Sequence, residues 1–183
     1  GLYRIEATNS GGFNLKNYRP EPDNPYAIGD NKIFCLLLDN AGKLWFGTER
    51  GGLGMYDPLI DGFISYKQDL KNDKALNSNS IWSIYQDKSS RLWLGSYSQG
   101  VFVCDPYEHR FNHVDKGNAS NLRLKFNTVT SFLDTENELW IGTDGGGISI
   151  WDKEKNKYRF LNANIKDPSS LVRDEVLCIY RDR

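Results

Sequence analysis

The sequence Leu44-Trp45-Phe46-Gly47-Thr48 occurs three times in this chain in closely related form. It returns as Leu92-Trp93-Leu94-Gly95-Ser96 and as Leu139-Trp140-Ile141-Gly142-Thr143. The tryptophans of the three copies are 48 and then 47 residues apart. A fixed period of this length is typical of a repeat architecture, in which each repeat is one small unit of secondary structure.

An apolar run that ends in aspartate precedes each copy: Ile33 to Asp39, Ile81 to Asp87 and Val129 to Asp134. The third run is one residue shorter, which accounts for the shorter interval. Small polar residues separate each aspartate from its Leu-Trp pair, so each pair of runs is predicted to form a β-hairpin. We expect the three aspartates to hydrogen-bond the turn backbone, as aspartate commonly does.

Two further short strands follow each copy. The first begins at a glycine and alternates in polarity, and a charged turn follows it; these stretches are Gly52 to Pro58, Gly100 to Pro106 and Gly147 to Lys153. The second strand is predicted over 63–66, 110–114 and 158–161. Each period therefore holds four short antiparallel strands, close to the size of a β-propeller blade of about 40 to 50 residues.

The predicted fold is an all-β propeller in four-stranded blades of about 48 residues, with no helical period anywhere. The predicted units are the second half of a blade over 1–19, three whole blades over 33–66, 81–114 and 128–161, and the first strand of a further blade over 176–183. The chain is then a partial propeller, a segment of a longer array. If it exists alone, unpaired strands at both ends are expected to attract another chain.

Composition limits the partners. The net charge of −1 gives no basic surface for nucleic acid. No stretch has the length of a membrane span or the pattern of a signal peptide, so contact with a membrane is expected only through segments outside this chain. The cysteines at 35, 104 and 178 lie in separate units, so we expect free, buried thiols and no disulfide.

Catalytic, cofactor and metal sites are not predicted. The repeated tryptophans are expected to pack between blades, although a sugar-stacking role is the alternative, and the glycine clusters are expected in turns with positive φ. His109 and His113 lack a third metal ligand. No nucleophile elbow or paired carboxylates stand out, and Asn118-Ala119-Ser120 fits the glycosylation pattern.

A binding surface is predicted where the turns vary. In a propeller, the turns between second and third strands share one face with the connections that enter each first strand. Polar side chains occupy these tips on an otherwise repeated framework, which is how a rigid scaffold presents a binding site. The candidate ligand-binding residues, suited to a polar ligand such as a carbohydrate, are Glu49, Arg50, Tyr97, Gln99, Asp144 and Arg173.

The repeat resembles the two-component-regulator propeller family. The stretch Ile81 to Asp87, then Leu92-Trp93-Leu94-Gly95-Ser96 and Gly100-Val101-Phe102, carries the resemblance, and so does Phe132 to Ile148. It covers essentially the whole chain. WD40 repeats are a poorer match, because Trp151-Asp152 is the lone Trp-Asp pair.

The resemblance implies a periplasmic sensor segment of a Bacteroidetes hybrid two-component regulator. Such regulators are inner-membrane anchored, carry a histidine kinase, act as homodimers, respond to oligosaccharides and control polysaccharide-utilisation genes. The segment itself would not be an enzyme. Two alternatives remain open: a structural or protein-docking propeller without its own ligand site, and a propeller lyase or hydrolase.

Overall fold

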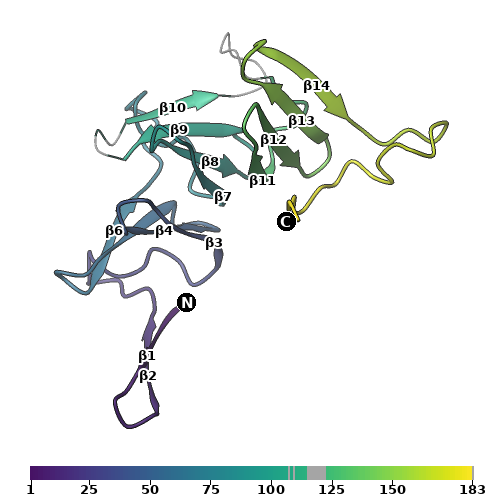
Figure 1. Ribbon diagram of the computed structural model, residues 1–183. Helices are drawn as coiled ribbons and strands as arrows, with labels where there is room; N and C mark the ends of the chain where they lie inside the picture. Colours follow the sequence, from purple (N-terminus) through teal and green to yellow (C-terminus); the bar gives the residue numbers. More distant parts are fainter. Residues whose placement is uncertain (107, 109, 115–122, 183) are drawn as a thin grey trace.

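A computed structural model describes residues 1–106, 108, 110–114 and 123–182, and within them the chain forms fourteen β-strands. A two-stranded hairpin comes first, followed by three four-stranded sheets (Figure 1). The hairpin strands are β1 (Leu2–Ala7) and β2 (Phe13–Tyr18). The first sheet contains β3 (Ile33–Leu38), β4 (Leu44–Thr48), β5 (Leu53–Asp57) and β6 (Gly62–Tyr66). The second contains β7 (Ile81–Gln86), β8 (Leu92–Ser96), β9 (Val101–Asp105) and β10 (Arg110–Val114). The third contains β11 (Val129–Asp134), β12 (Glu138–Thr143), β13 (Gly147–Asp152) and β14 (Lys157–Leu161).

Each sheet has its strands in chain order, and all neighbours are antiparallel. The first strands of successive sheets are in contact, β3 with β7 and β7 with β11. The sheets follow one another in a curved row, with the N-terminal hairpin at one end and the last connection at the other (Figure 1). Sheets that meet along their first strands are the blades of a propeller, as predicted.

The repeated tryptophans pack between blades. Trp45 is buried in one cluster with Ile81 and Leu92 of the next sheet. Trp93 repeats this contact against Leu139 of the third sheet. The packing role predicted from the sequence is therefore confirmed for Trp45 and Trp93, whose rings are 1% and 6% exposed.

The glycine of the repeated motif marks the closest approach of two blades. A Cβ atom on Gly95 would lie 2.2 Å from Ser83 Oγ and 2.8 Å from the Val129 carbonyl oxygen. The first strand of the third sheet therefore lies against the second strand of its neighbour at a distance that a larger residue would prevent.

Aspartate closes the first turn in two of the three sheets. Asp39 Oδ1 accepts hydrogen bonds from Ala41 N and Lys43 N, and Oδ2 accepts one from Trp45 Nε1 at 2.8 Å. Asp87 makes the same contacts with its own turn, and its Oδ2 accepts a hydrogen bond from Trp93 Nε1 at 2.9 Å. The prediction of a turn role holds for these two residues.

The prediction is wrong for Asp134. The shorter run places Asp134 inside β11, opposite Leu139, and its carboxylate pairs with Lys153 across the sheet. Thr135 takes the turn position instead, where its Oγ1 accepts Glu138 N at 3.0 Å. Trp140 consequently donates its Nε1 to Glu138 Oε2 at 2.9 Å. β11 is as long as β3 and β7, so the missing residue lies in the turn, and Asp134 occupies the strand position of Leu38 and Gln86.

The connections between sheets each insert one apolar side chain into the core. Ile28, Leu76 and Leu124 occupy equivalent places and are 1%, 0% and 5% exposed. Each belongs to the core of the sheet that follows it. Each connection is thus anchored to the hydrophobic core by one buried side chain.

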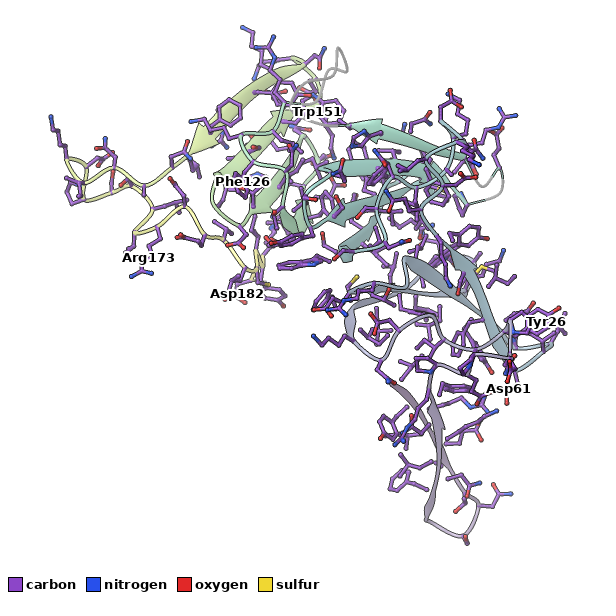
Figure 2. All side chains as sticks on the ribbon, turned by 180° about the vertical axis from the view of Figure 1, so that it is seen from behind. Tyr26, Asp61, Phe126, Trp151, Arg173 and Asp182 are labelled. Atoms are coloured by element: carbon purple, nitrogen blue, oxygen red, sulfur yellow. The ribbon has the colours of Figure 1, made fainter. Side chains whose placement is uncertain are left out.

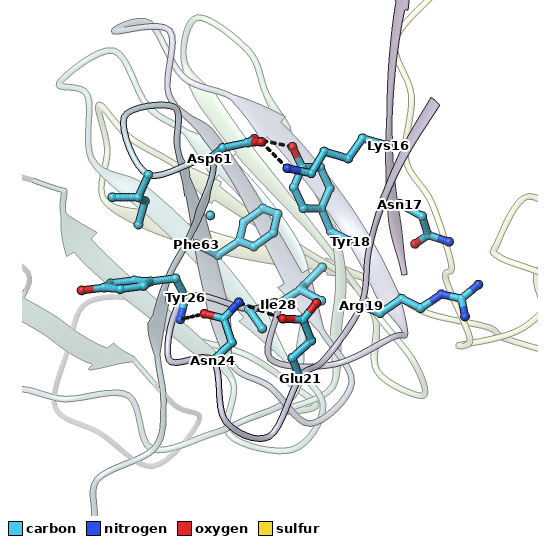
Figure 3. A pocket seen from close by; sticks show the side chains of 13 residues that line it. Lys16, Asn17, Tyr18, Arg19, Glu21, Asn24, Tyr26, Ile28, Asp61 and Phe63 are labelled. Carbon is cyan, nitrogen blue, oxygen red and sulfur yellow. Dashed lines mark hydrogen bonds and ion pairs between the residues drawn. The ribbon is translucent and has the colours of Figure 1, made fainter. Parts of the chain in front are cut away.

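A polar cluster joins the N-terminal hairpin to the first sheet (Figure 3). Asp61, in the turn between β5 and β6, accepts hydrogen bonds from Arg4 at 2.8 Å, Tyr18 at 2.6 Å and Tyr56 at 2.7 Å, and it pairs with Lys16. The hydrogen bond from Lys16, followed by those from Tyr18 and Tyr56, holds the pKa of Asp61 well below its usual range. The adjoining cavity of about 190 Å³ is lined by Lys16, Tyr18 and Asp61 of this cluster, together with residues such as Glu21, Tyr26 and Phe63. The carboxylate of Asp61 pairs with Arg4 and Lys16, so the cluster holds the hairpin against the first sheet.

The predicted first strand over 176–183 is not formed in residues 176–182. Val176 N does donate to Thr143 O at 2.9 Å, and a Cβ on Gly142 would lie 3.0 Å from the Val176 side chain. Val176 therefore sits against the third sheet as Val129 sits against the second. A strand needs a ladder partner, and among the described residues no strand pairs with 176–182.

The thiols differ in burial. Within the described residues all three cysteines are free, with Cys104 buried, Cys35 partly buried and Cys178 exposed. The absence of a disulfide was predicted, but uniform burial was not correct, because Cys178 lies in the stretch that forms no strand. The described part of the chain also has no helix able to cross a membrane.

Candidate functional site

The turns between second and third strands are joined by hydrogen bonds to the segments that enter the first strands. The first residue of each turn donates to its own sheet: Glu49 N to Lys32 O at 3.1 Å, Tyr97 N to Ser80 O at 3.2 Å, and Asp144 N to Thr128 O at 3.0 Å. The closing glycine donates to the next connection: Gly52 N to Asn79 O, Gly100 N to Asn127 O, and Gly147 N to Asp174 O, each at 2.8 Å. These segments therefore form one continuous surface, here called the turn face.

A buried hydroxyl makes each turn rigid. Thr48, Ser96 and Thr143 end the second strands, and each donates its Oγ to the carbonyl of the closing glycine at 2.9 to 3.0 Å. Each Oγ also accepts an amide from the turn at 2.8 to 3.1 Å. The closing glycines have φ of 79°, 67° and 69°, as the sequence predicted. The framework under the variable tips is thus preorganised.

Glu49 and Arg50 lie together at the first turn. Glu49 pairs with Lys32 at 2.9 Å and with Arg50 Nε at 3.5 Å. Asp30 accepts the backbone N–H of Arg50 at 2.8 Å and that of Lys32 at 3.1 Å. The structure thus brings these two predicted residues into one group of mutually paired charges.

Tyr97 and Gln99 lie in the second turn. The Tyr97 ring is 52% exposed and packs on Trp82, with ring centroids 5.3 Å apart. Trp82 in turn packs on Phe34 of the first sheet, with centroids 5.1 Å apart. These three residues, Phe34, Trp82 and Tyr97, are called the aromatic row. Gln99 uses its backbone to hold the turn, and its carboxamide contacts Ser98 Oγ at 3.4 Å.

Asp144 and Arg173 belong to the third turn and the last connection. Asp144 is half-buried, and its backbone forms an isolated antiparallel β-bridge with Glu175. Arg173 is exposed and lies toward the C-terminal end of the chain (Figure 2). The ring of Phe126 lies against Gly145, where an added Cβ would be 3.4 Å from it. The six predicted residues therefore occupy four separate segments of the turn face.

Phe34 and Trp82 were missed by sequence reasoning, which treated the first strands as buried apolar runs. Each occupies the second position of its strand, where the pairing skips one residue: between Ile33 and Cys35, and between Ile81 and Ser83. This β-bulge re-aims the side chain out of the regular pleat. The only signal in the sequence is a large aromatic at that position in two sheets, where the third has Thr130.

Hydrogen bonds hold two members of the aromatic row, Trp82 and Tyr97, in place. Trp82 Nε1 donates to Ser80 Oγ at 3.0 Å, and Thr128 of the third sheet donates its hydroxyl to the Tyr97 carbonyl. Phe34 and Tyr97 leave about half of their ring surface open, at 43% and 52%. The row crosses a blade boundary and offers flat apolar surface beside hydroxyl and amide groups, a combination typical of ligand sites.

The histidines and the glycosylation triplet singled out in the sequence form no metal or catalytic site among the described residues. His113 lies in β10 with its ring stacked on Phe102 at 4.6 Å and a contact to the Gln99 carbonyl. His109 and the triplet 118–120 lie outside the described residues. Within the described ranges, no group of three His, Cys, Asp or Glu side chains could hold a metal ion.

Comparison with known proteins gives a matching repeat model and a fold. The two component regulator propeller model matches residues 27–50 and 75–98. No curated protein matches the chain.

Three solved structures illustrate the fold. The first is described as the extracellular domain of the hybrid two component system BT3049 from B. thetaiotaomicron; it is 20% identical with a TM-score of 0.70, over 82% of this chain and 21% of that one. The corresponding domain of BT4673 is 16% identical with a TM-score of 0.70, over 96% and 22%. Virginiamycin B lyase from Staphylococcus aureus is 12% identical with a TM-score of 0.57, over 89% and 56%.

This chain spans about a fifth of the length of the two sensor-system domains. At these identities the likeness establishes the blade architecture alone. The matched residues 27–50 contain the first copy of the repeated motif up to its turn, and 75–98 contain the second. The chain thus contains two stretches that match the two component regulator propeller repeat, and its fold is similar to that of the two sensor-system domains.

Proposed function

We propose that this chain is a ligand-binding part of the sensor region of a hybrid two-component regulator, and that oligosaccharides bind at the aromatic row. The observation that carries the proposal is the half-open ring surface of Phe34 and Tyr97, braced by Trp82 across a blade boundary. The apolar face of a sugar ring packs on such surfaces, while its hydroxyls need neighbouring hydroxyls and amides. Ser98 and Gln99 supply such groups beside Tyr97.

The proposal for the whole protein follows from the family. The two solved relatives are described as extracellular domains of such systems, which supports a periplasmic place for this segment in an inner-membrane protein. We propose that the full-length protein acts as a homodimer, carries a histidine kinase and controls polysaccharide-utilisation genes. The segment itself contributes recognition and no catalysis.

The test is titration of the 183-residue protein with a panel of oligosaccharides, followed by calorimetry and tryptophan fluorescence. We expect Tyr97→Ala to weaken binding by about tenfold or more, since loss of a stacked ring costs roughly 1 to 3 kcal/mol where such stacking has been measured. Tyr26→Ala is the matched control, because Tyr26 is 53% exposed and lies at the opposite end from Arg173 (Figure 2). It should leave binding unchanged.

Two results would contradict the proposal. A protein that binds no member of the panel is better explained as a structural or docking propeller. Release of products from an oligosaccharide, stopped by substitution of a turn-face carboxylate such as Asp144, would instead favour a lyase or hydrolase.

A further inference from the structure

The charges of the turn face cancel beside the aromatic row. On the first sheet, the cations Lys32 and Arg50 share the single carboxylate of Glu49. The carboxylate of Asp30 lies below them and accepts two backbone amides. The two cations, Lys32 and Arg50, and the two carboxylates thus form one group without net charge. This group lies on the Phe34 side of the row.

The segments around Trp82 and Tyr97 carry no charged side chain. They consist of residues 78–80 and 97–99, which are serine, asparagine, tyrosine and glutamine. Two of these polar groups already accept hydrogen bonds from within the protein. Asn79 Oδ1 accepts one from Gln68 N at 2.7 Å, and Ser80 Oγ accepts one from Trp82 Nε1. The Ser98 hydroxyl and the Gln99 carboxamide remain exposed or nearly so beside the Tyr97 ring.

The third sheet adds a negative charge on the far side of Tyr97. Asp144 stands at the start of its turn, on the segment bonded to Thr128. Lys125, the cation of the preceding connection, is turned to Asn162 Oδ1 at 2.5 Å and to the Phe160 ring at 5.0 Å. An anionic ligand on the row would therefore meet paired cations on one side and a carboxylate on the other.

We infer that the aromatic row selects uncharged oligosaccharides and rejects those that carry carboxylate or sulfate groups. This inference rests on the proposed function, because it names the ligand class of the same site. Recognition of an acidic sugar requires a cation that is free to pair with it, and discrimination arises as much from repulsion as from attraction.

The experiment compares acidic oligosaccharides with their carboxyl-reduced, uncharged counterparts, alongside a panel of neutral oligosaccharides. We expect every ligand that binds to be uncharged. We also expect its affinity to change by less than about twofold between 0.1 M and 1 M salt, although the screening length falls from about 10 Å to about 3 Å.

The variant Glu49→Gln releases Lys32 and Arg50 from their shared carboxylate. It should raise the affinity for acidic ligands relative to neutral ones by up to about fivefold, the scale of one surface charge pair. Glu136→Gln is the control, since it makes the same change in net charge in the turn between β11 and β12, away from the turn face.

The outcomes separate the two levels of the proposal. Salt-dependent binding of acidic oligosaccharides to the unaltered protein, lost in Tyr97→Ala, would overturn the charge selection and leave the proposed function intact. Binding of no oligosaccharide, or binding that Tyr97→Ala does not weaken, would overturn the proposed function itself.

Discussion

At the scale of single residues, the aspartate that closes the first turn determines how the following tryptophan is held. Asp39 is 6% exposed and satisfies two turn amides together with the indole N–H of Trp45. Trp45 is itself almost wholly buried between two sheets. A donor left unpaired in such a place costs about 1 to 3 kcal/mol.

We therefore predict that Asp39→Ala lowers the free energy of unfolding by about 2 to 4 kcal/mol, because it leaves both the indole and the turn amides without their acceptor. Asp39→Asn keeps one acceptor and should cost less. Glu136→Ala, at an exposed residue in the turn between β11 and β12, should change stability by less than about 0.5 kcal/mol. Urea unfolding of the three variants measures this, and equal losses in all three would contradict the assigned role.

At the scale of an element, the closing glycine of each turn links conformation to packing. Gly42 and Gly52 have nearly the same φ, 78° and 79°. A Cβ on Gly42 would meet no atom within 4 Å, whereas one on Gly52 would lie 2.1 Å from the Tyr66 carbonyl oxygen. The two positions therefore separate the cost of a left-handed backbone from the cost of a steric clash.

We predict that Gly42→Ala costs about 1 to 2 kcal/mol, the left-handed backbone penalty alone. Gly52→Ala should cost clearly more, because β5 and β6 must also move apart at the turn face. Thermal unfolding gives the comparison, and oligosaccharide titration of Gly52→Ala reports whether the turn face has moved. An equal loss in both variants would show that the clash relaxes without cost.

At the scale of the whole molecule, the three blades leave apolar surface at the hairpin end. Tyr3, Ile5, Phe13 and Leu15 of the hairpin are 55%, 62%, 70% and 66% exposed. Ile5 and Leu15 face each other across β1 and β2, so they form one apolar face. A patch of this kind favours association with another chain.

We predict that the 183-residue protein self-associates in a concentration-dependent way, and that light scattering gives a mass above 21.0 kDa. The double substitution Ile5→Lys and Leu15→Glu should shift it toward the monomer, since both new side chains point from the apolar face. The control is Asn14→Lys on the other face of β2, which leaves the pair of Lys16 and Asp61 intact. A stable monomer at all concentrations would contradict the prediction.

The sequence by itself determined the repeat, the four strands of each blade, the packing role of Trp45 and Trp93, and the common face of the turns. These features follow from periodicity and from local turn chemistry, which act within one unit of about 48 residues. Of the candidate site, it identified Tyr97 and the turns, but the aromatic partners of Tyr97 were not apparent.

The tertiary structure decided what depends on the neighbouring blade. Phe34 and Trp82 reach the turn face only because a β-bulge turns them out of the strand, and they meet only because β3 and β7 lie side by side. Asp134 lies in its strand, at the position of Leu38 in the first sheet, because the turn that follows it is one residue shorter. Residues 176–182 form no strand because no second strand pairs with them among the described residues. Contacts between distant units arise from packing, and a local pattern in the sequence cannot encode them alone.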